Sequence, residues 1–435
     1  MQNAGDATAN YKLDAGIRQS HKHFLKVIFH SQRFVRSLIL IYHFCHLDST
    51  SDLVKLLILN QYAPPAQAPT SRLVDELRAF LVHQGHTVRI VSEQAEYRGH
   101  HARTGSRLLR ELKALAVITW GALWSKPRPD VVLALSSPPC LLVAAALVAS
   151  IRRIVLAHWA MDLYPDLAIA LGELPTGASG IFRTLMRWAY HRCAIIVALD
   201  DDMAAQLNKV YGVEAKIISP WAAADLIVEV IPPPTQSIGA TFAAQSWTWL
   251  YSGNLGRAHE WRPILLAQRE LEDRALPIQL LFEGGGAMWM DAQRFASELK
   301  LKNCHWCDYA DEAQSLQTVL ASSVVIATQR REARGLLWPS KLARIIPMRK
   351  PLIWIGPTDG AIANGIRDRP DTACFEPEQI PQIVDWIAAS HRAPQTSAHL
   401  DSAARIWERQ RVERCNQWEF LLKNVASSAP NTGRQ

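Results

Sequence analysis

The repeated alternation of short apolar runs with amphipathic segments constrains the fold of this chain most strongly. The pattern begins at residues 53–59, which are apolar except for Lys55, as expected for a parallel strand covered on both faces. A proline-rich loop follows at 61–69, and Thr70 is the predicted cap of a helix that ends at Gly85. Residues 86–91 read as the next strand. Such a βαβ unit crosses over right-handed and builds a parallel sheet.

The same pattern recurs along most of the 435 residues, which are too many for one ordinary core. Further strands are predicted at 131–135, 154–158, 194–199 and 215–219, and then at 247–251, 278–282, 324–327 and 352–355. We therefore predict an α/β protein with two doubly wound Rossmann-like domains, whose parallel sheets face each other across a cleft. In such sheets ligands bind beyond the carboxyl ends of the strands.

The domain boundaries follow from composition. We expect an N-terminal domain at 52–222 and a C-terminal domain at 246–395, because the segment between them contains Pro232, Pro233 and Pro234. A last helix, within 396–424, has an apolar stripe that fits packing back across the junction. Residues 1–51 look foreign to the rest, and read either as a poorly ordered extension or as a basic amphipathic segment that rests on a membrane.

The composition limits which cellular compartment and which classes of partner fit this chain. The seven cysteines are odd in number and scattered, which favours a reducing compartment. Cys304 and Cys307 lack a second ligand pair, so no metal is assigned to them. The net charge of +7 suits an anionic membrane or phosphorylated substrates. No apolar run reaches the ~20 residues of a membrane span, so we predict a cytoplasmic protein and keep open a peripheral position on the inner face of the membrane.

Two glycine-containing stretches follow predicted strands of the second half. Residues 251–257 read YSGNLGR, in which Gly253 and Gly256 let backbone N–H groups approach an anion and Arg257 adds a positive charge. Residues 282–286 read FEGGG and suit a loop close to a ligand. Each stretch also fits an ordinary turn. Neither has the form GxGxxG, which disfavours a nicotinamide cofactor.

A third candidate segment is residues 330–341, which read RREARGLLWPSK. Pro339 suits the first position of a helix, whose free N–H groups would meet a phosphate. Ser340 and Lys341 supply a hydroxyl and a positive charge to the same phosphate, and Glu332 suits sugar hydroxyls. The alternative is a solvated charge run ahead of a helix.

The N-terminal half contributes polar residues at strand ends. His158 ends the strand at 154–158 and Asp162 follows it, where an imidazole suits acid/base work or the orientation of a hydroxyl. His158 stands beside Trp159 and equally suits packing, so Asp162 is the better candidate. Residues 60–65 read NQYAPP and either line an acceptor pocket or form a rigid crossover.

A helix predicted at 106–124 has a basic side and an apolar side. Such a helix suits an anionic lipid surface, although a plain surface helix fits equally well. The candidates for membrane contact are Arg103, Arg107, Arg110 and Lys113.

In their order and spacing, these motifs resemble bacterial glycosyltransferases of family 4, in the branch that builds cell-surface polysaccharides. The resemblance spans residues 53–386. It rests on LNQYAPP at 59–65, GHTV at 85–88, DLYPD at 162–166, YSGNLG at 251–256, GGG at 284–286 and PSK at 339–341. It implies the GT-B fold, a nucleotide-diphosphate sugar donor, retention of anomeric configuration, and no need for a cofactor or a bound metal.

The resemblance also distributes roles among the residues. It places the donor diphosphate at the glycine loop and Lys341, Glu332 near the donor sugar, and the Asp162 region opposite the reacting carbon. The predicted catalytic residues are Asp162, His158 and Glu332. The predicted donor-binding residues are Gly253, Asn254, Gly256, Arg257, Gly285, Gly286, Arg331, Ser340 and Lys341. The predicted acceptor-side residues are Asn60, Gln61, Tyr62 and Tyr164.

One position departs from the family pattern. Three residues after Lys341, where such enzymes often carry a glutamate that holds the nucleotide ribose, this chain has Arg344. A basic side chain cannot accept the ribose hydroxyl bonds.

Taken together, the motifs predict transfer of a hexosyl or N-acetylhexosaminyl group to a glycan or lipid-linked acceptor, with no nucleic acid partner. Two alternatives are a nucleotide-sugar epimerase of the same fold and a catalytically impaired nucleotide-binding partner in a polysaccharide synthesis complex.

Overall fold

The computed structural model of the chain describes residues 53–64, 68–93, 104–174, 176–222, 238–393 and 400–428. The predicted extension at 1–51 and the three prolines at 232–234 lie outside these ranges. Residues Val54–Gln435 form one compact unit, which contains both sheets.

The N-terminal domain is built on a six-stranded parallel sheet in the order β2-β1-β3-β4-β5-β6. Its strands are β1 Lys55–Leu59, β2 Thr87–Val91, β3 Val131–Ala134, β4 Val155–Trp159, β5 Ile195–Ala198 and β6 Lys216–Ile217. Every residue of the central strand β3 is buried, as its unbroken apolar run predicts for a strand covered on both faces.

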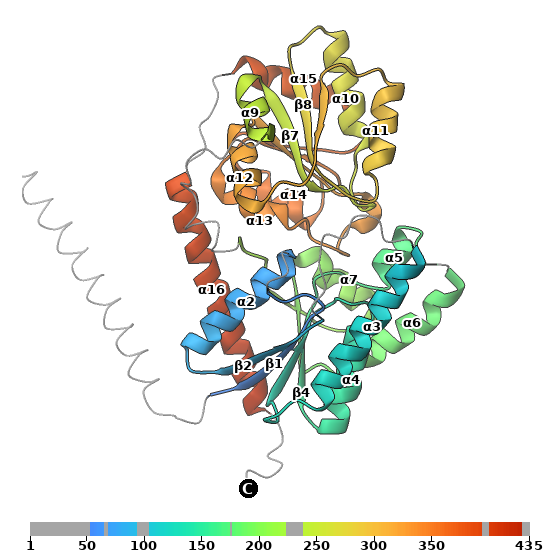
Figure 1. Cartoon of the computed structure of the whole chain (residues 1–435), viewed down its shortest axis with the longest axis vertical. Coiled ribbons are helices and arrows are strands. Elements are labelled where there is room, and N and C mark those ends of the chain that lie inside the picture. Colours follow the sequence, from blue (N-terminus) through green and yellow to red (C-terminus); the bar gives the residue numbers. More distant parts are fainter. Residues whose placement is uncertain are drawn as a thin grey trace, which may run out of the picture. The chain divides into compact units, whose positions relative to one another are not determined.

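Helices cover both faces of this sheet. They are α2 Pro69–His83, α3 Thr104–Leu123, α4 Leu141–Arg152, α5 Asp166–Ala170, α6 Thr176–Tyr190 and α7 Asp201–Tyr211. Helix α2 lies on one side, while α3, α4 and α6 lie together on the other (Figure 1). The predicted cap at Thr70 is wrong. The N-cap of α2 is Ala68, because Pro69 occupies the first helical position, where its missing N–H costs nothing.

The C-terminal domain repeats the scheme with a six-stranded parallel sheet in the order β12-β11-β10-β7-β8-β9. Its strands are β7 Thr248–Asn254, β8 Gln279–Gly285, β9 Cys304–Cys307, β10 Val324–Thr328, β11 Leu352–Ile355 and β12 Thr372–Phe375. The sequence pattern did not predict the edge strand β12. The predicted fold class, with two Rossmann-like parallel sheets, is confirmed.

The helices of this domain also lie on both faces of their sheet. They are α9 Ile238–Gln245, α10 Arg262–Asp273, α11 Trp289–Glu298, α12 Glu312–Ala321, α13 Lys341–Ile345, α14 Ala361–Ile366 and α15 Ile380–Arg392, with two 3-10 turns, η1 Arg331–Ala333 and η2 Ile346–Met348. Helix α9 falls within the stretch that the sequence pattern left as a linker. Helix α12 begins after Asp311, whose side chain forms a capping box with Gln314.

The last helix, α16 Leu400–Ser427, joins the two cores. Its Trp407 is buried in the core of the C-terminal domain and donates from Nε1 to the carbonyl oxygen of Arg344 at 3.2 Å. Further along the helix, Trp418 is buried in the N-terminal core, with its ring centroid 4.8 Å from that of Trp159. One apolar stripe on α16 thus packs against both domains (Figure 1).

Candidate functional site

A cavity of about 330 Å³ lies where the two domains meet. The N-terminal domain contributes α2 and the residues that follow β6, and the C-terminal domain contributes the carboxyl ends of β7 and β8 together with the start of α13. The lining includes Arg72, Trp221, Gly253, Asn254, Glu312 and Lys341. The cavity therefore lies where doubly wound sheets bind ligands.

Two glycines form part of its wall. Gly253 and Gly284 are register partners in the paired strands β7 and β8, and both have positive φ, at 122° and 138°. A Cβ atom on Gly284 would lie 2.2 Å from the carbonyl oxygen of Gly253, so no larger residue fits there. The strand ends therefore expose backbone rather than side chains to whatever binds.

Lys341 is a buried cation beside this wall. Its Nζ lies 3.4 Å from the ring centroid of Tyr251 and has no hydrogen-bond partner among the described residues. Burial, with a smaller contribution from the charge of Arg344, lowers the pKa of Lys341 to about 7. Burial removes water from the ammonium group, and the contact with the aromatic ring offsets only part of that lost hydration energy. It is therefore ready to pair with an anion in the cavity.

His259 also faces the cavity, and sequence reasoning missed it. Its Nδ1 lies 2.9 Å from the carbonyl oxygen of Thr328. Because that oxygen only accepts, Nδ1 carries the proton and Nε2 is left as an acceptor. Burial and the nearby charge of Lys341 lower the pKa of His259 to about 3, so the ring is neutral. The only sequence signal is its place three residues after Gly256, in the same loop.

Two carboxylates line the cavity, and neither was predicted. Glu283, only 2% exposed, accepts from the hydroxyl of Ser252 at 3.1 Å, and burial raises its pKa. Glu312 is held between two arginines, with Arg344 of α13 at 2.9 Å and Arg72 of α2 at 3.0 Å. Arg344 therefore has a carboxylate partner on the cavity wall. It orients a carboxylate that also binds the other domain.

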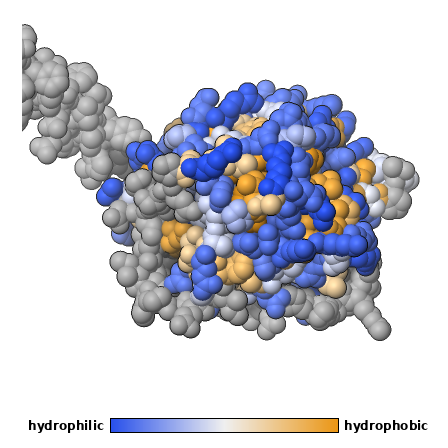
Figure 2. All heavy atoms as spheres, turned by 90° about the horizontal axis from the view of Figure 1, so that it is seen from above, coloured by the Kyte–Doolittle hydropathy of each residue, from blue (hydrophilic) through white to orange (hydrophobic). Residues whose placement is uncertain are grey.

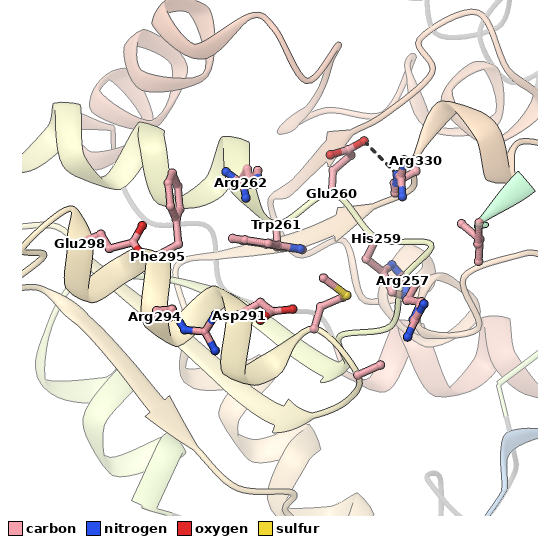
Figure 3. Close-up of a pocket in the computed structure, with 13 residues that line it drawn as sticks. Arg257, His259, Glu260, Trp261, Arg262, Asp291, Arg294, Phe295, Glu298 and Arg330 are labelled. Carbon is pink, nitrogen blue, oxygen red and sulfur yellow. Dashed lines mark ion pairs between the residues drawn. The ribbon is translucent and has the colours of Figure 1, made fainter. Parts of the chain in front are cut away.

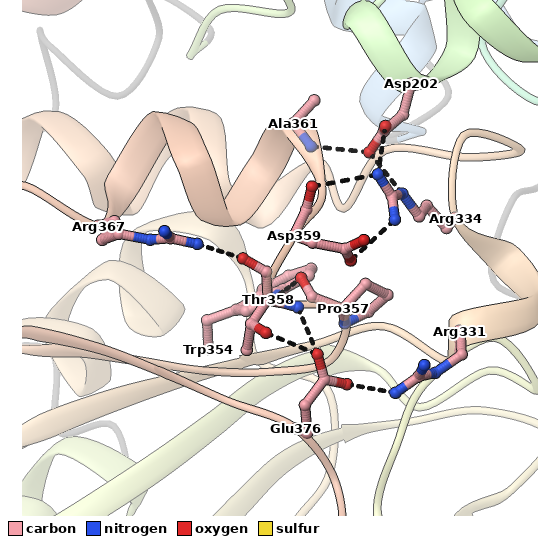
Figure 4. A network of polar contacts seen from close by, with 10 residues as sticks. All are labelled: Asp202, Arg331, Arg334, Trp354, Pro357, Thr358, Asp359, Ala361, Arg367 and Glu376. Carbon is pink, nitrogen blue, oxygen red and sulfur yellow. Dashed lines mark hydrogen bonds and ion pairs between the residues drawn. The ribbon is translucent and has the colours of Figure 1, made fainter.

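The loop that leads to Lys341 is tied to the N-terminal domain by backbone and by charge. Asp162 forms an antiparallel bridge with Leu337. Asp202 of α7 accepts from Nε and Nη2 of Arg334, at 3.1 and 3.0 Å, and from the amide of Ala361 at 2.7 Å (Figure 4). Asp202 thus fixes the loop after β10 and the start of α14 with one carboxylate.

A second, larger cavity of about 680 Å³ lies mainly on the C-terminal domain. Arg262 stacks there on the rings of Trp261 and Phe295, at 4.9 and 4.7 Å (Figure 3). Arg257 lines the same cavity and forms an ion pair with Glu173 of the N-terminal domain at 3.4 Å. His259 lines both cavities, so the two are neighbours.

A known protein family matches part of this chain. Residues 70–221, which cover most of the N-terminal domain, match the model of Glycosyltransferase Family 4. This chain carries a glycosyltransferase family 4 domain. The family predicted from the motifs is thereby confirmed, while its cell-surface polysaccharide branch stays a prediction. No curated protein matches the sequence significantly.

Solved structures extend the likeness of the family 4 domain to the whole two-domain fold. Anabaena HepE in complex with UDP and glucose is 15% identical, with a TM-score of 0.60 over 85% of this chain and 100% of that chain. The catalytic domain of starch synthase IV from Arabidopsis thaliana, bound to ADP and acarbose, is 11% identical, with a TM-score of 0.57 over 86% and 100%. An α,α-trehalose-phosphate synthase (UDP-forming) from Burkholderia xenovorans, in complex with glucose-6-phosphate, is 13% identical, with a TM-score of 0.58 over 86% and 100%. At these identities the likeness shows the fold.

The structure brings together four of the predicted donor-binding residues. Gly253, Asn254, Ser340 and Lys341 all line the cavity between the domains. Gly285 and Gly286 come directly after Gly284, and a Cβ atom on Gly285 would lie 2.8 Å from the Tyr309 ring. Gly256 packs beside Asn254 and His259. Arg257 lines the second cavity instead.

Three details of the loop before α13 differ from expectation. Pro339 is not the first helical residue, because Ser340 is the N-cap and α13 has only five residues. Arg331 lines neither cavity and pairs with Glu376 at 2.7 Å (Figure 4). Glu332 is 51% exposed and pairs with Arg330 at 3.3 Å, and it lines neither cavity.

The two predicted catalytic residues of the family 4 domain have different surroundings. His158 is 1% exposed, donates from Nδ1 to the carbonyl oxygen of Ala134 at 2.8 Å, and has a pKa lowered to about 4 by burial. It lines neither cavity. Asp162 lies at the domain junction, where burial raises its pKa to about 6. Asp162 also lines neither cavity, but its bridge partner Leu337 lines the cavity between the domains, so Asp162 stays the better catalytic candidate.

Two of the predicted acceptor-side residues, Asn60 and Gln61, hold the loop after β1. Asn60 is fully buried and donates from Nδ2 to the carbonyl oxygen of Tyr62 at 2.7 Å. Gln61 accepts from the hydroxyl of Ser137 at 2.5 Å. Tyr62 and Tyr164 are half-buried, and neither lines the two cavities.

The remaining sequence candidates that the structure describes line neither cavity. Arg103 falls outside the described residues, Arg107 lies in the first turn of α3, Arg110 is exposed, and Lys113 pairs with Glu93 at 3.1 Å. Cys304 and Cys307 pack on opposite faces of their sheet, which prevents them from chelating one ion. Within the described ranges, no three His, Cys, Asp or Glu side chains gather as a metal site would require.

Proposed function

We propose that this chain is a glycosyltransferase that moves a sugar from a nucleotide-diphosphate donor to a glycan or lipid-linked acceptor. The observation that carries the proposal is the buried Nζ of Lys341, which has no hydrogen-bond partner within the described ranges and lines a cavity between two Rossmann-like domains. A diphosphate there would supply the missing anion. The sugar attached to it would then extend toward the domain junction.

The proposed reaction depends on stabilising the negative charge of the leaving nucleoside diphosphate. Departure of a nucleoside diphosphate develops negative charge on its terminal phosphate, and a preorganised cation in a water-poor site stabilises that charge. Lys341 is placed for this role. The neutral His259 presents Nε2 as an acceptor, which suits a sugar or phosphate hydroxyl rather than a charged oxygen.

The ribose contact is proposed to shift from position 344 to Glu312. Arg344 cannot accept a hydroxyl bond, but it holds the Glu312 carboxylate at 2.9 Å on the wall of the same cavity. A carboxylate oxygen keeps acceptor capacity after one contact with a guanidinium. Arg344 would then act by positioning Glu312, and Arg72 would link that contact to the N-terminal domain.

Asp162 is proposed to face the reacting carbon, and retention of configuration and independence from a bound metal remain part of the proposal. HepE binds UDP and glucose and starch synthase IV binds ADP, as their structures describe. These neighbours support a nucleotide ligand for this fold without selecting its base.

The test is a panel of UDP, GDP and ADP sugars, with binding measured by calorimetry and turnover followed as release of nucleoside diphosphate. Binding of at least one member, lost in a Lys341→Met variant, supports the proposal. No binding and no turnover with any member overturns it. Turnover that yields an isomerised donor in the absence of acceptor would identify the epimerase alternative.

The impaired-partner alternative predicts a different pattern. Such a chain would bind the nucleotide tightly without any turnover, and would co-purify with another transferase. Asp162→Asn separates the two cases. In an active enzyme it lowers kcat and leaves nucleotide binding in place, whereas in an impaired partner it changes neither quantity.

A further inference from the structure

Helix α3 is apolar on two opposite sides. Ala114, Ile118 and Ala122 are fully buried against the domain. On the other side, Leu109 and Trp120 are 70% and 66% exposed. A surface helix with one partner normally places polar residues on its outer face. The outward stripe of α3 therefore lacks the composition of a solvated surface.

The outward stripe continues across the two neighbouring helices. Helix α4, which packs between α3 and α6, exposes Leu147 at 52% and Ile151 at 63%, and α6 exposes Ile181 at 70% (Figure 1). Within the described ranges, nine of the fifteen exposed large apolar side chains belong to these three helices and to the residue after α3. These nine define the α3–α4–α6 face: Leu109, Leu112, Val117, Trp120, Trp124, Leu147, Ile151, Ile181 and Leu185.

The clustering is specific to this face. Single exposed apolar residues are normal, but a contiguous set marks an interaction surface. The view from above onto the C-terminal domain shows mostly hydrophilic residues, with smaller apolar areas between them (Figure 2). The C-terminal domain contributes only Leu266 and Met290 to the fifteen.

The charge around the face is predominantly positive. The segments of α3, α4 and α6 contain six arginines and lysines and one acidic residue, Glu111. At the ends of the helices, Arg128 donates to the carbonyl oxygen of Arg153 at 2.6 Å, and Arg192 lies over the ring of Trp188 at 5.5 Å. The apolar stripe is thus flanked by cations.

We propose that the α3–α4–α6 face docks on an anionic lipid bilayer. The aliphatic side chains would enter the acyl boundary while the flanking cations meet phosphate groups. Trp120 and Trp124 pack against each other, 5.7 Å between centroids, and are exposed by 66% and 61%. Indole rings favour the boundary between headgroups and acyl chains, because one edge is polar and the rest is not.

A second copy of the chain is a poorer occupant. A symmetric dimer through this face would bring two sets of cations together, and like charges at an interface oppose association. An acidic lipid surface instead neutralises them. This proposal concerns a surface outside the interdomain cavity, so its test is independent of the test of the donor chemistry.

The experiment is sedimentation of the full chain with vesicles of phosphatidylcholine alone or mixed with phosphatidylglycerol. We expect binding to the mixed vesicles that weakens with salt, and little binding to phosphatidylcholine. The paired substitution Trp120→Ser with Ile151→Ser should weaken binding at least tenfold, and so should Arg110→Glu with Arg128→Glu.

The matched controls change the same residue kinds elsewhere. Phe420→Ser removes an apolar side chain that is 63% exposed on α16, and Lys209→Glu with Lys302→Glu reverses two exposed charges. Melting curves verify that each variant is folded. No binding of the wild type to the mixed vesicles overturns the proposal, as does an equal loss in the controls. A dimer in solution that the Trp120 variant abolishes would assign the face to a second copy instead.

Discussion

The ammonium nitrogen of Lys341 lies 3.4 Å from the centre of the Tyr251 ring, with no hydrogen-bond acceptor among the described residues. The ring compensates only part of the hydration that the charge has lost. This arrangement costs stability in the unliganded protein, and an anion in the cavity would recover it. Lys341 is therefore the residue on which the proposed donor site depends most.

Replacing Lys341 with Met should separate binding from stability. Loss of a charge-assisted hydrogen bond of about 1.5–3 kcal/mol predicts a nucleoside diphosphate affinity lower by ~10–150-fold. The unliganded variant should unfold at the same or a higher urea concentration, because a buried unpaired charge has gone. Calorimetry and urea titration measure the two effects. Lys302→Met, at an exposed position, is the control and should change neither.

The lowered pKa of Lys341 gives binding and stability opposite pH dependence. The pKa falls from its ordinary 10.5 to about 7, so above pH 7 the folded chain holds a neutral amine while the unfolded chain stays protonated. This group therefore adds stability as pH rises from about 7 toward 10.5. A bound diphosphate favours the ammonium, so Kd should rise with pH above 7, by at most ~10-fold per unit. A pH-independent Kd in the wild type would contradict the assignment.

Glu312 should control discrimination of the ribose. If its carboxylate accepts a ribose hydroxyl, Glu312→Gln weakens binding of the ribonucleotide by ~10-fold and of the 2′-deoxy analogue much less, since a neutral bond contributes about 0.5–1.5 kcal/mol. Glu298→Gln, an exposed glutamate outside this cavity, is the control. Equal losses for both nucleotides would show that Glu312 only supports the domain contact with Arg72.

Asp202 should contribute to stability through its three contacts across the domain junction. Asp202→Ala leaves the Arg334 guanidinium and the amide of Ala361 without this acceptor, which predicts a loss of about 1–3 kcal/mol. The adjacent Asp201 is exposed, so Asp201→Ala serves as the matched control. Urea denaturation measures both. A loss from Asp201→Ala as large as that from Asp202→Ala would contradict the role of the network in Figure 4.

Gly284→Ala should damage the cavity wall. Its φ of 138° is rarely adopted by L side chains, and a Cβ atom would meet the Gly253 carbonyl at 2.2 Å. We expect destabilisation of about 3 kcal/mol together with loss of nucleotide binding. Gly365→Ala, with nothing within 4 Å of the added Cβ atom, is the control. A Gly284→Ala variant that binds nucleotide normally would contradict this description of the wall.

The repeated strand and helix pattern was sufficient to predict two parallel-sheet domains, because apolar periodicity reports which faces are covered. Apolar runs such as β3 are buried throughout, as predicted. The motifs also located Gly253, Asn254, Ser340 and Lys341, since glycines and cations at strand ends carry a local signal. Strand β12 escaped prediction because its four residues are only partly buried at the edge of the sheet.

The partners of the site residues depend on contacts between segments far apart in the chain. No local pattern links Glu312 to Arg72, which lie 240 positions apart, or reveals that Arg344 orients a carboxylate. Burial likewise separates His158, enclosed in the N-terminal core, from Asp162 at the domain junction, although only three residues lie between them. Composition and period act locally along the chain, whereas charge pairing and desolvation depend on which surfaces the folded chain brings together.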